Sequence, residues 1–448
     1  MHANRLWALW QALVLSMAIG FGQQRGRQRF VEWVTGLALN VEEHTITQSL
    51  IGLDRVADGK ALESFAEYGS WNLQLLQGGT AGAIARTAEP RWYGYHVWAG
   101  DDTKVHRSSA DVWDTCTFHE YTARCPNRAA TVRAHNWVVV GALLPRPDDP
   151  ALFLPVAGLL YFRKSQLPAS EQAFHTKCEL LVALVRQQAA WLPGPHLVAF
   201  DGGFAVGSVV RPLVRPSDPQ QPRIEFITRL RRDARLCRLP PTERRPGQRG
   251  PMPKWGQPLP PPRQGGRWPG PWHEGRVFLY GRVRRVRWKE VVCLWHVLGH
   301  ETPVKVVVAE VEGYRKRFTL VTSALELTGL QVLELFCARF RQEDGFRDLK
   351  QRLGWEECRA WTKNPIERTT QALFVTMTAL RLLQLQLQEA VGDDWWLHPP
   401  WNPHKTRPSV LDVERLLRQE RAGIQECLAA WLDEGEKAGT GQATRMAM

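Results

Sequence analysis

The sequence predicts a mixed α/β fold, and the order of its apolar segments carries that prediction. The runs His135–Leu144 and Ala151–Phe162 are nearly continuous in apolar residues, as strands buried on both faces of a sheet are. A strand-like segment, Tyr93–Gly100, precedes them. A helical period follows over residues 170–192, and a short apolar run returns at His196–Phe200. Strands followed by a helix and a further strand indicate one α/β core.

The charge balance indicates a polyanionic partner. The chain has 448 residues and a formal net charge of +13. Such an excess favours binding to nucleic acid or to another anionic surface. Eight cysteines are scattered without a CxxC pair, which favours reduced thiols in a cytoplasm. Cys116, His119 and Cys125 lack a fourth ligand at usable spacing, so we expect no zinc site there.

The apolar stretch Leu6–Phe21 is a candidate targeting or membrane segment. It is interrupted by Gln11 and Ser16, is short for a membrane span, and is followed by a cationic run without a small-residue cleavage site. We therefore expect a buried N-terminal helix, or a start site further upstream, and no membrane partner.

Composition and periodicity divide the chain into five regions. Residues 1–88 read as a helical domain suited to DNA binding or dimerisation, and residues 89–222 as the first part of the α/β core. Residues 223–328 read as an inserted, mostly β domain. Residues 329–390 would complete the core, and residues 391–448 would form a C-terminal helix, Val410–Leu432, and a disordered tail after Glu436.

The segment 239–272 lies within the predicted insertion and is rich in Pro, Gly and Arg. Such a composition does not form regular structure. It fits an extended basic loop that follows a phosphate backbone, or equally a plain surface linker. The strands predicted after it are Arg276–Val286, Glu290–Leu298, Val304–Val311 and Phe318–Thr322.

Two aspartates follow apolar strands and are candidate metal ligands. Asp101 comes directly after the predicted strand Tyr93–Gly100, and Asp201 after His196–Phe200. Ligands gather where the strands of an α/β sheet end, so neighbouring strands would bring the two carboxylates together. Asp102 is the alternative first carboxylate, because it directly precedes Thr103. Taken singly, each aspartate could also simply start a turn.

A predicted helix over residues 336–354 supplies a third carboxylate. At about 3.6 residues per turn, Phe336, Arg339, Glu343 and Lys350 fall on one narrow stripe beside an apolar face. A solvated charged face is the plain explanation of such a stripe. Phosphodiester hydrolysis with two metal ions instead needs carboxylates that converge on hard cations about 4 Å apart.

In these motifs the sequence resembles the DDE transposases of bacterial insertion sequences, in the branch with a Tyr-x2-Arg-x3-Glu-x6-Lys signature. The match is Phe336-x2-Arg339-x3-Glu343-x6-Lys350, which departs only in Phe for Tyr. The segments GDDT at 100–103 and VAFDGGF at 198–204 are similar to the motifs around the first two carboxylates of that family. The resemblance covers residues 30–410.

The resemblance implies a ribonuclease H-like core with two Mg²⁺ or Mn²⁺ ions. Asp101, Asp201 and Glu343 would be the catalytic metal ligands, while Arg339 and Lys350 would bind DNA phosphates. The Tyr hydroxyl that is missing at Phe336 would take away one phosphate contact of that family but would not affect the metal site.

The expected activity is that of a transposase. The enzyme would cut double-stranded DNA at terminal inverted repeats and join the 3′-hydroxyl ends to target DNA, acting as a homodimer in the DNA complex. A bacterial cytoplasmic location beside the nucleoid follows from the same resemblance. The alternatives are a ribonuclease H-like nuclease without strand transfer and a DNA-binding protein that has lost its chemistry.

Overall fold

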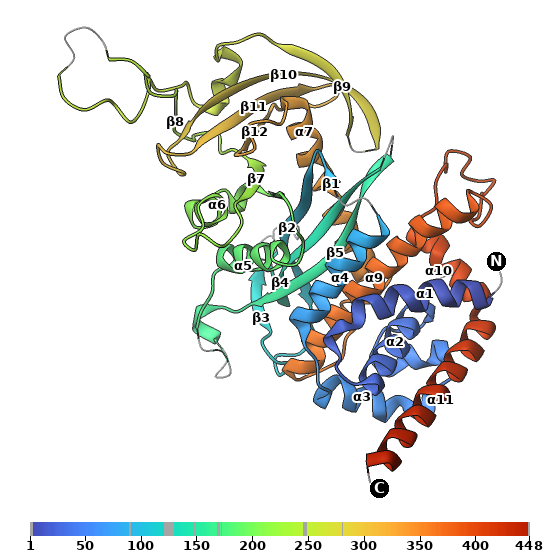
Figure 1. The fold of residues 1–448 in the computed structure, drawn as a ribbon. Helices are drawn as coiled ribbons and strands as arrows, with labels where there is room; N and C mark the ends of the chain where they lie inside the picture. The colour runs from blue at the N-terminus through green and yellow to red at the C-terminus, as the bar shows by residue number, and fades with distance from the viewer. Residues whose placement is uncertain are drawn as a thin grey trace.

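The computed structural model describes residues 3–88, 91–120, 130–146, 149–167, 171, 173–244, 249–279 and 281–446. The predicted mixed α/β fold is confirmed. One mixed sheet of twelve strands runs through the molecule, in the order β3-β4-β2-β6-β7-β12-β11-β10-β8, with β1, β5 and β9 paired to its side. Figure 1 shows a layer of helices against one end of this sheet and a curved group of strands at the other.

Four strands form the part of the sheet that was predicted as the core: β2 (Tyr95–His106), β4 (Thr131–Arg146), β5 (Asp149–Tyr161) and β6 (His196–Phe200). The next strand, β7 (Ile224–Arg229), belongs to the residues predicted as an insertion. The strands β5, β4 and β2 are antiparallel neighbours, and β6 and β7 continue parallel to β2. Two short strands, β1 (Arg91–Trp92) and β3 (Cys116–His119), pair with β2 and β4.

The helices around these strands cover both faces. α5 (Lys177–Ala189) packs on β2 and β4, where Leu181 approaches Gly100 so closely that a Cβ there would lie 2.4 Å from it. α8 (Arg341–Gln351) packs on β2 and β5 from the other face. α6 (Gly207–Val214) lies beside α5 and β7. Because successive side chains of a strand point to opposite faces, the residue after Gly100 points toward α8.

The strands of residues 223–328 continue the same sheet. β7 pairs with β12 (Phe318–Thr322), which pairs in turn with β11 (Pro303–Val311). The outer strands are β10 (Arg282–Trp295), β9 (His273–Leu279) and the short β8 (Leu236–Cys237). α7 (Gly329–Ala338) packs on this curved group, at the top of Figure 1.

One predicted strand boundary in this region is wrong. The sequence predicts a strand over Arg276–Val286 and a second over Glu290–Leu298. The chain instead reverses at Gly281, which has a φ of +81°, a left-handed conformation that glycine adopts without a steric cost. Arg282 therefore pairs with Leu279, and β10 runs unbroken to Trp295.

The N-terminal and C-terminal helices form one layer. The helices are α1 (Ala3–Met17), α2 (Gln24–Leu39), α3 (Gly59–Tyr68), α4 (Leu73–Thr87), α9 (Lys363–Val391), α10 (Val410–Gln419) and α11 (Arg421–Met446). α2 and α9 contact each other along this layer, and α1 and α4 also pack on α9. The helical N-terminal region thus shares its core with the C-terminal third of the chain.

The apolar N-terminal stretch is a buried helix, as predicted. Leu6, Trp10 and Met17 of α1 are fully buried. Trp10 donates a hydrogen bond to the Thr35 hydroxyl on α2, at 2.9 Å, which satisfies its indole nitrogen inside the core. Within the described residues, no helix is long and apolar enough to cross a membrane.

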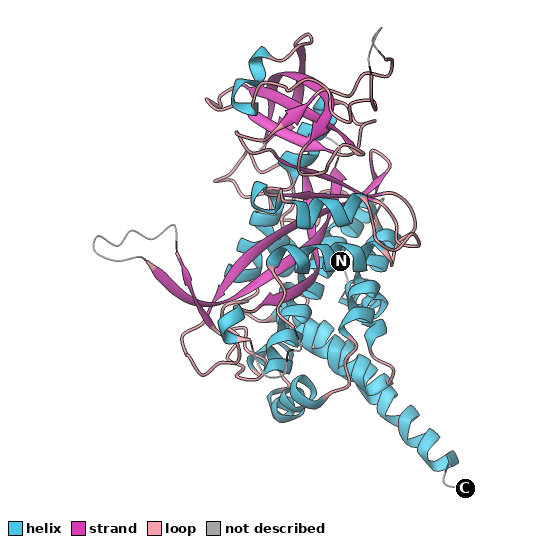
Figure 2. Ribbon diagram, turned by 90° about the vertical axis from the view of Figure 1, so that its left-hand side faces the viewer, coloured by secondary structure: helices cyan, strands magenta, loops and turns pink. Residues whose placement is uncertain are grey.

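The C-terminal helix differs from the prediction in two ways. The predicted single helix Val410–Leu432 is interrupted at Glu420, between α10 and α11. α11 then extends to Met446, past Glu436, where the sequence predicts a disordered tail. In Figure 2 this helix projects beyond the helical layer.

Candidate active site

The register of β2 and β6 places Asp101 beside Asp201. The two strands run parallel, and their last pair is Gly100 with Phe200. Asp201 follows as the cap of a short 3-10 helix, while its carbonyl accepts a hydrogen bond from the Thr228 hydroxyl at 3.2 Å. The two aspartates are therefore at the same level of the sheet.

The prediction that the first strand ends before Asp101 is wrong. β2 continues to His106, because its antiparallel partner β4 pairs with it as far as Ala134. Only the parallel partner β6 stops at this level. Asp101 thus lies in mid-strand, at the point where its neighbour on one side has ended, and this leaves room for its side chain.

The predicted helix over residues 336–354 is broken in two. α7 ends at Ala338 and α8 begins at Arg341. Arg339 and Phe340 keep right-handed helical dihedral angles, but the local bonds are of the tighter i to i+3 kind, such as Phe340 N to the Cys337 carbonyl at 3.1 Å. Arg339 lies in this junction, and Glu343 is in the first turn of α8.

Arg339 contacts all three predicted carboxylates. Its Nη1 donates to Asp101 Oδ2 at 2.8 Å. Its Nη2 lies 4.0 Å from Asp201 Oδ1 and 3.9 Å from Glu343 Oε1. The guanidinium group of Arg339 therefore contacts carboxylates from two adjacent strands and from a helix that lies more than a hundred residues after them in the chain.

Burial differs among the members of this cluster. The side chain of Arg339 is 10% exposed and that of Asp101 is 21% exposed, whereas those of Asp201 and Glu343 are half exposed. Burial raises the pKa of Asp101 to about 6, although Arg339 opposes the rise. Burial also raises the pKa of Glu343, again against Arg339. Asp101 is therefore on the buried side of the cluster, whereas Asp201 and Glu343 are on the side that solvent and substrate can reach.

Asp102, the alternative first carboxylate, points away from the cluster. Its Oδ2 accepts a hydrogen bond from Lys177 Nζ on α5 at 2.6 Å. Asp101 and Asp102 are consecutive in a strand, so their side chains emerge on opposite faces of the sheet. The face that carries Asp102 is the one covered by α5.

Lys350 and Phe336 lie apart from the carboxylates. Lys350 Nζ donates to the backbone carbonyl of Lys104 and lies 3.6 Å from Glu356 Oε1. Burial lowers the pKa of Lys350. Phe336 is buried, and its ring centroid is 5.7 Å from the guanidinium carbon of Arg339, so the ring packs against this arginine.

The donor types of the cluster fit a divalent metal ion. Carboxylate oxygens are the ligands that Mg²⁺ prefers, and all three carboxylates already surround one cationic group. Their present spacing is set by Arg339, and among the described residues no three His, Cys, Asp or Glu side chains are close enough to hold an ion. Coordination would therefore require Arg339 to leave the centre of the cluster. Cys125, considered above with Cys116 and His119, lies outside the described residues.

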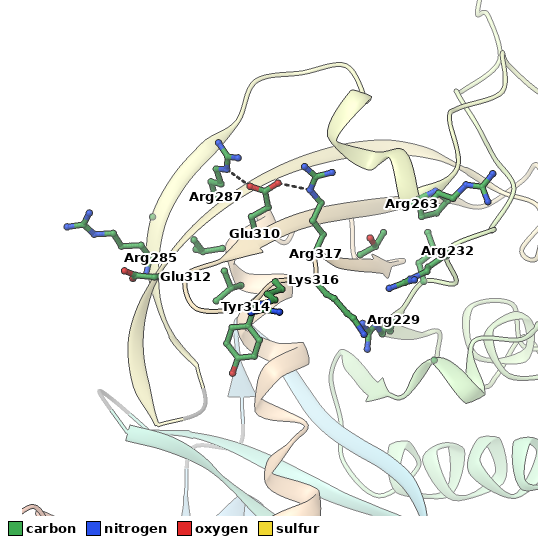
Figure 3. Close-up of a pocket in the computed structure, with 18 of the residues that line it drawn as sticks. Arg229, Arg232, Arg263, Arg285, Arg287, Glu310, Glu312, Tyr314, Lys316 and Arg317 are labelled. Atoms are coloured by element: carbon green, nitrogen blue, oxygen red, sulfur yellow. Dashed lines mark hydrogen bonds and ion pairs between the residues drawn. The ribbon is translucent and has the colours of Figure 1, made fainter. Parts of the chain in front are cut away.

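A large basic groove adjoins the carboxylates, and the sequence did not predict it as a site. It has a volume of about 1380 Å³, and Gly202, the residue after Asp201, contributes to its wall. Ten Arg and Lys side chains and three Glu side chains line it. Figure 3 shows Arg229, Arg232 and Arg263 on one side of this groove and Arg285 on the other. Two features of the sequence point to it: the basic segment 239–272, expected either to follow a phosphate backbone or to be a plain linker, and the density of arginine in residues 276–287.

The comparisons identify the family. A family model described as "DDE superfamily endonuclease" matches residues 17–292. The chain belongs to the DDE superfamily endonucleases. The part of this DDE endonuclease that matches includes Asp101 and Asp201 and ends before Glu343. No curated protein matches the chain.

Proposed function

We propose that this DDE endonuclease is a DNA transposase, which cuts the ends of a mobile element and joins their 3′-hydroxyl groups to target DNA. The observation that carries the proposal is the contact of one guanidinium group with Asp101, Asp201 and Glu343. Three carboxylates from distant parts of the chain seldom converge without a function, because their mutual repulsion opposes folding.

The fold supports the ribonuclease H-like core that the resemblance implies. The parallel strands β2 and β6 end their pairing where the two aspartates lie, and α8 packs across β2 to bring Glu343 to the same place. The three carboxylates follow one another along the chain in the order of the family's motifs: Asp101 on β2, Asp201 after β6 and Glu343 on α8. The proposed active site therefore needs no rearrangement of strands.

Each residue has a proposed role. Asp101, Asp201 and Glu343 would hold two Mg²⁺ or Mn²⁺ ions, which when bound activate the attacking oxygen and stabilise the leaving one. Before a metal ion binds, Arg339 favours the ionised form of the inner carboxylate, Asp101, and orients it through a 2.8 Å hydrogen bond; it would release Asp101 when the ions enter. The half-exposed Glu343 and Asp201 face the open side, where a scissile phosphate can approach. Phosphate binding by Arg339 and Lys350 is part of the proposal, as is a homodimer on double-stranded DNA.

Strand transfer distinguishes this proposal from a nuclease that only cuts. The purified protein should be incubated with Mn²⁺, a linear duplex that ends in the inverted repeats flanking its gene, and a supercoiled target plasmid. We expect plasmids joined covalently to the labelled 3′ ends. Cut ends without joined plasmid would support the nuclease alternative, and repeat DNA that is bound but uncut would support a protein without catalytic activity.

A further inference from the structure

We propose that the basic groove of residues 202–319, lined by β7 and β9–β12, binds the backbone of duplex DNA and leads it to the carboxylate cluster. This inference rests on the proposed function, because it assigns a surface to the same substrate. Its evidence is the composition, shape and position of the groove, and these are independent of the chemistry at Asp101, Asp201 and Glu343.

The groove has a large surplus of positive charge. Glu310, one of its three acidic residues, is already held between Arg287 Nε at 2.5 Å and Arg317 Nε at 2.6 Å. Several of the lining cations have no ion pair within the described part of the chain: Arg229, Arg232, Arg276, Arg285, Arg315 and Lys316. Unpaired arginines that face one cavity repel each other, so a bound polyanion would stabilise the arrangement.

The shape of the groove fits an extended polyanion. A volume of about 1380 Å³ is larger than one phosphate group or a nucleotide requires. Both walls carry cations, which come from β7, the hairpin β9–β10 and the turn between β11 and β12. Figure 3 shows Arg232 and Arg285 on opposite sides of the groove, with Lys316 between them beside Tyr314. Several phosphates of one backbone can therefore be bound at once.

The lining favours duplex DNA over unpaired bases. Single strands are bound largely by aromatic side chains on which the bases stack. Among the described residues that line the groove, Tyr314 is the one aromatic residue. Arginine forks suit the phosphate oxygens that both kinds of DNA share, but without stacking surfaces the more densely charged duplex is bound better.

The position of the groove connects it to the active site. Gly202 lies in its wall and directly follows Asp201. The Pro- and Arg-rich segment 239–272 also contributes to it, through Pro262 and Arg263. That segment contains a 3-10 helix at Pro262–Arg267 and is anchored by the buried Trp268, whose indole donates to the Pro260 carbonyl at 2.8 Å. The part of the segment around Pro262 and Arg263 is therefore held in place as a wall of the groove.

A charge-matched pair of triple variants tests the proposal. The groove variant carries Arg232→Ala, Arg285→Ala and Lys316→Ala, all exposed positions where truncation opens no cavity. The control carries Lys164→Ala, Arg211→Ala and Arg415→Ala, three exposed cations that lie outside the groove and outside the helical residues 1–88. Both variants lose the same net charge, so a difference between them reports location and not charge alone.

Binding is measured by fluorescence anisotropy with a labelled duplex and a labelled single strand, in EDTA, at several salt concentrations. We expect the groove variant to bind the duplex at least about tenfold more weakly near 0.1 M salt, with a salt slope lower by about one unit for each lost phosphate contact. The control should bind nearly as the parent does. Equal losses in both variants would overturn the proposal, and so would a loss confined to the single strand.

The same assay separates this inference from the proposed function. Glu343→Gln should bind the duplex in EDTA as tightly as the parent, because the groove does not include Glu343. A groove variant that binds normally would overturn the groove assignment even if the parent cuts and joins DNA. A parent that never cuts DNA, but loses duplex binding in the groove variant, would leave the groove assignment standing and overturn the transposase.

Discussion

Glu343→Gln is expected to abolish metal-dependent cleavage of duplex DNA. The change keeps the size of the side chain and removes the charge that would hold a divalent ion. A metal ion stabilises the transition state of phosphodiester cleavage by several kcal/mol, so its loss should lower the rate by about a thousandfold or more. The fold should be unaffected, because Glu343 is half exposed and its nearest cation, Arg339, stays paired with Asp101.

The measurement is the initial rate of nicking of a labelled duplex in Mn²⁺. A matched control is Asp344→Asn, the next carboxylate of α8, which pairs with Arg341 at 2.7 Å and Arg347 at 3.0 Å. Partly exposed ion pairs of this kind contribute little to stability. The control should retain the parent rate. Cleavage by Glu343→Gln at the parent rate would show that Glu343 is not a ligand.

Asp101→Asn should have an effect as large as that of Glu343→Gln, whereas Asp102→Asn should not. The two residues differ in the face of the sheet on which they lie. Asp101 contacts Arg339, which also contacts Asp201 and Glu343. Asp102 contacts Lys177 of α5. The sequence left both as candidates, so the pair of variants is a direct test of the geometry.

The same nicking assay decides between the two aspartates. Thermal unfolding of both variants serves as the control, since each change removes one ion pair. Asp102→Asn should cut DNA within about threefold of the parent, because only a partly exposed pair with Lys177 is lost. An inactive Asp102→Asn together with an active Asp101→Asn would reverse the assignment of the first carboxylate.

The sequence predicted the central elements well because their signals are local. The apolar runs of β4 and β6 show their identity in their own residues. The continuation of β2 beyond Gly100 could not be predicted in this way. It depends on the pairing of Asp101–His106 with β4, and the consecutive polar residues 101–104 at the end of an apolar run look like a turn.

The site was predicted as a set of residues but not as a geometry. The spacing of Arg339 and Glu343 suggested one helix, and the i to i+4 relation survives the break between α7 and α8 because the junction stays right-handed helical. The role of Arg339 was expected to be phosphate binding. Its contact with Asp101 depends on how far α8 lies from β2, which no local pattern contains.

The basic groove could not be predicted from any single segment of the sequence. Its cations lie between Arg229 and Arg317, in four separate segments whose closeness follows from the pairing of β7 with β12 and of β9 with β10. Net charge predicted a polyanionic partner. The surface that binds it could be located only once the strands of residues 223–328 were seen to extend the central sheet.

Asp101, Asp201 and Glu343 are proposed to act together as metal ligands, and the proposed chemistry depends on this more than on any other feature. The direct measurement is the binding of Mn²⁺ to the protein at neutral pH, followed by electron paramagnetic resonance of the free ion and without DNA. The parent should bind Mn²⁺, and Asp201→Asn and Glu343→Gln should each weaken that binding by at least about tenfold, with Asp102→Asn unchanged. Identical Mn²⁺ binding by all four proteins would contradict the shared metal site.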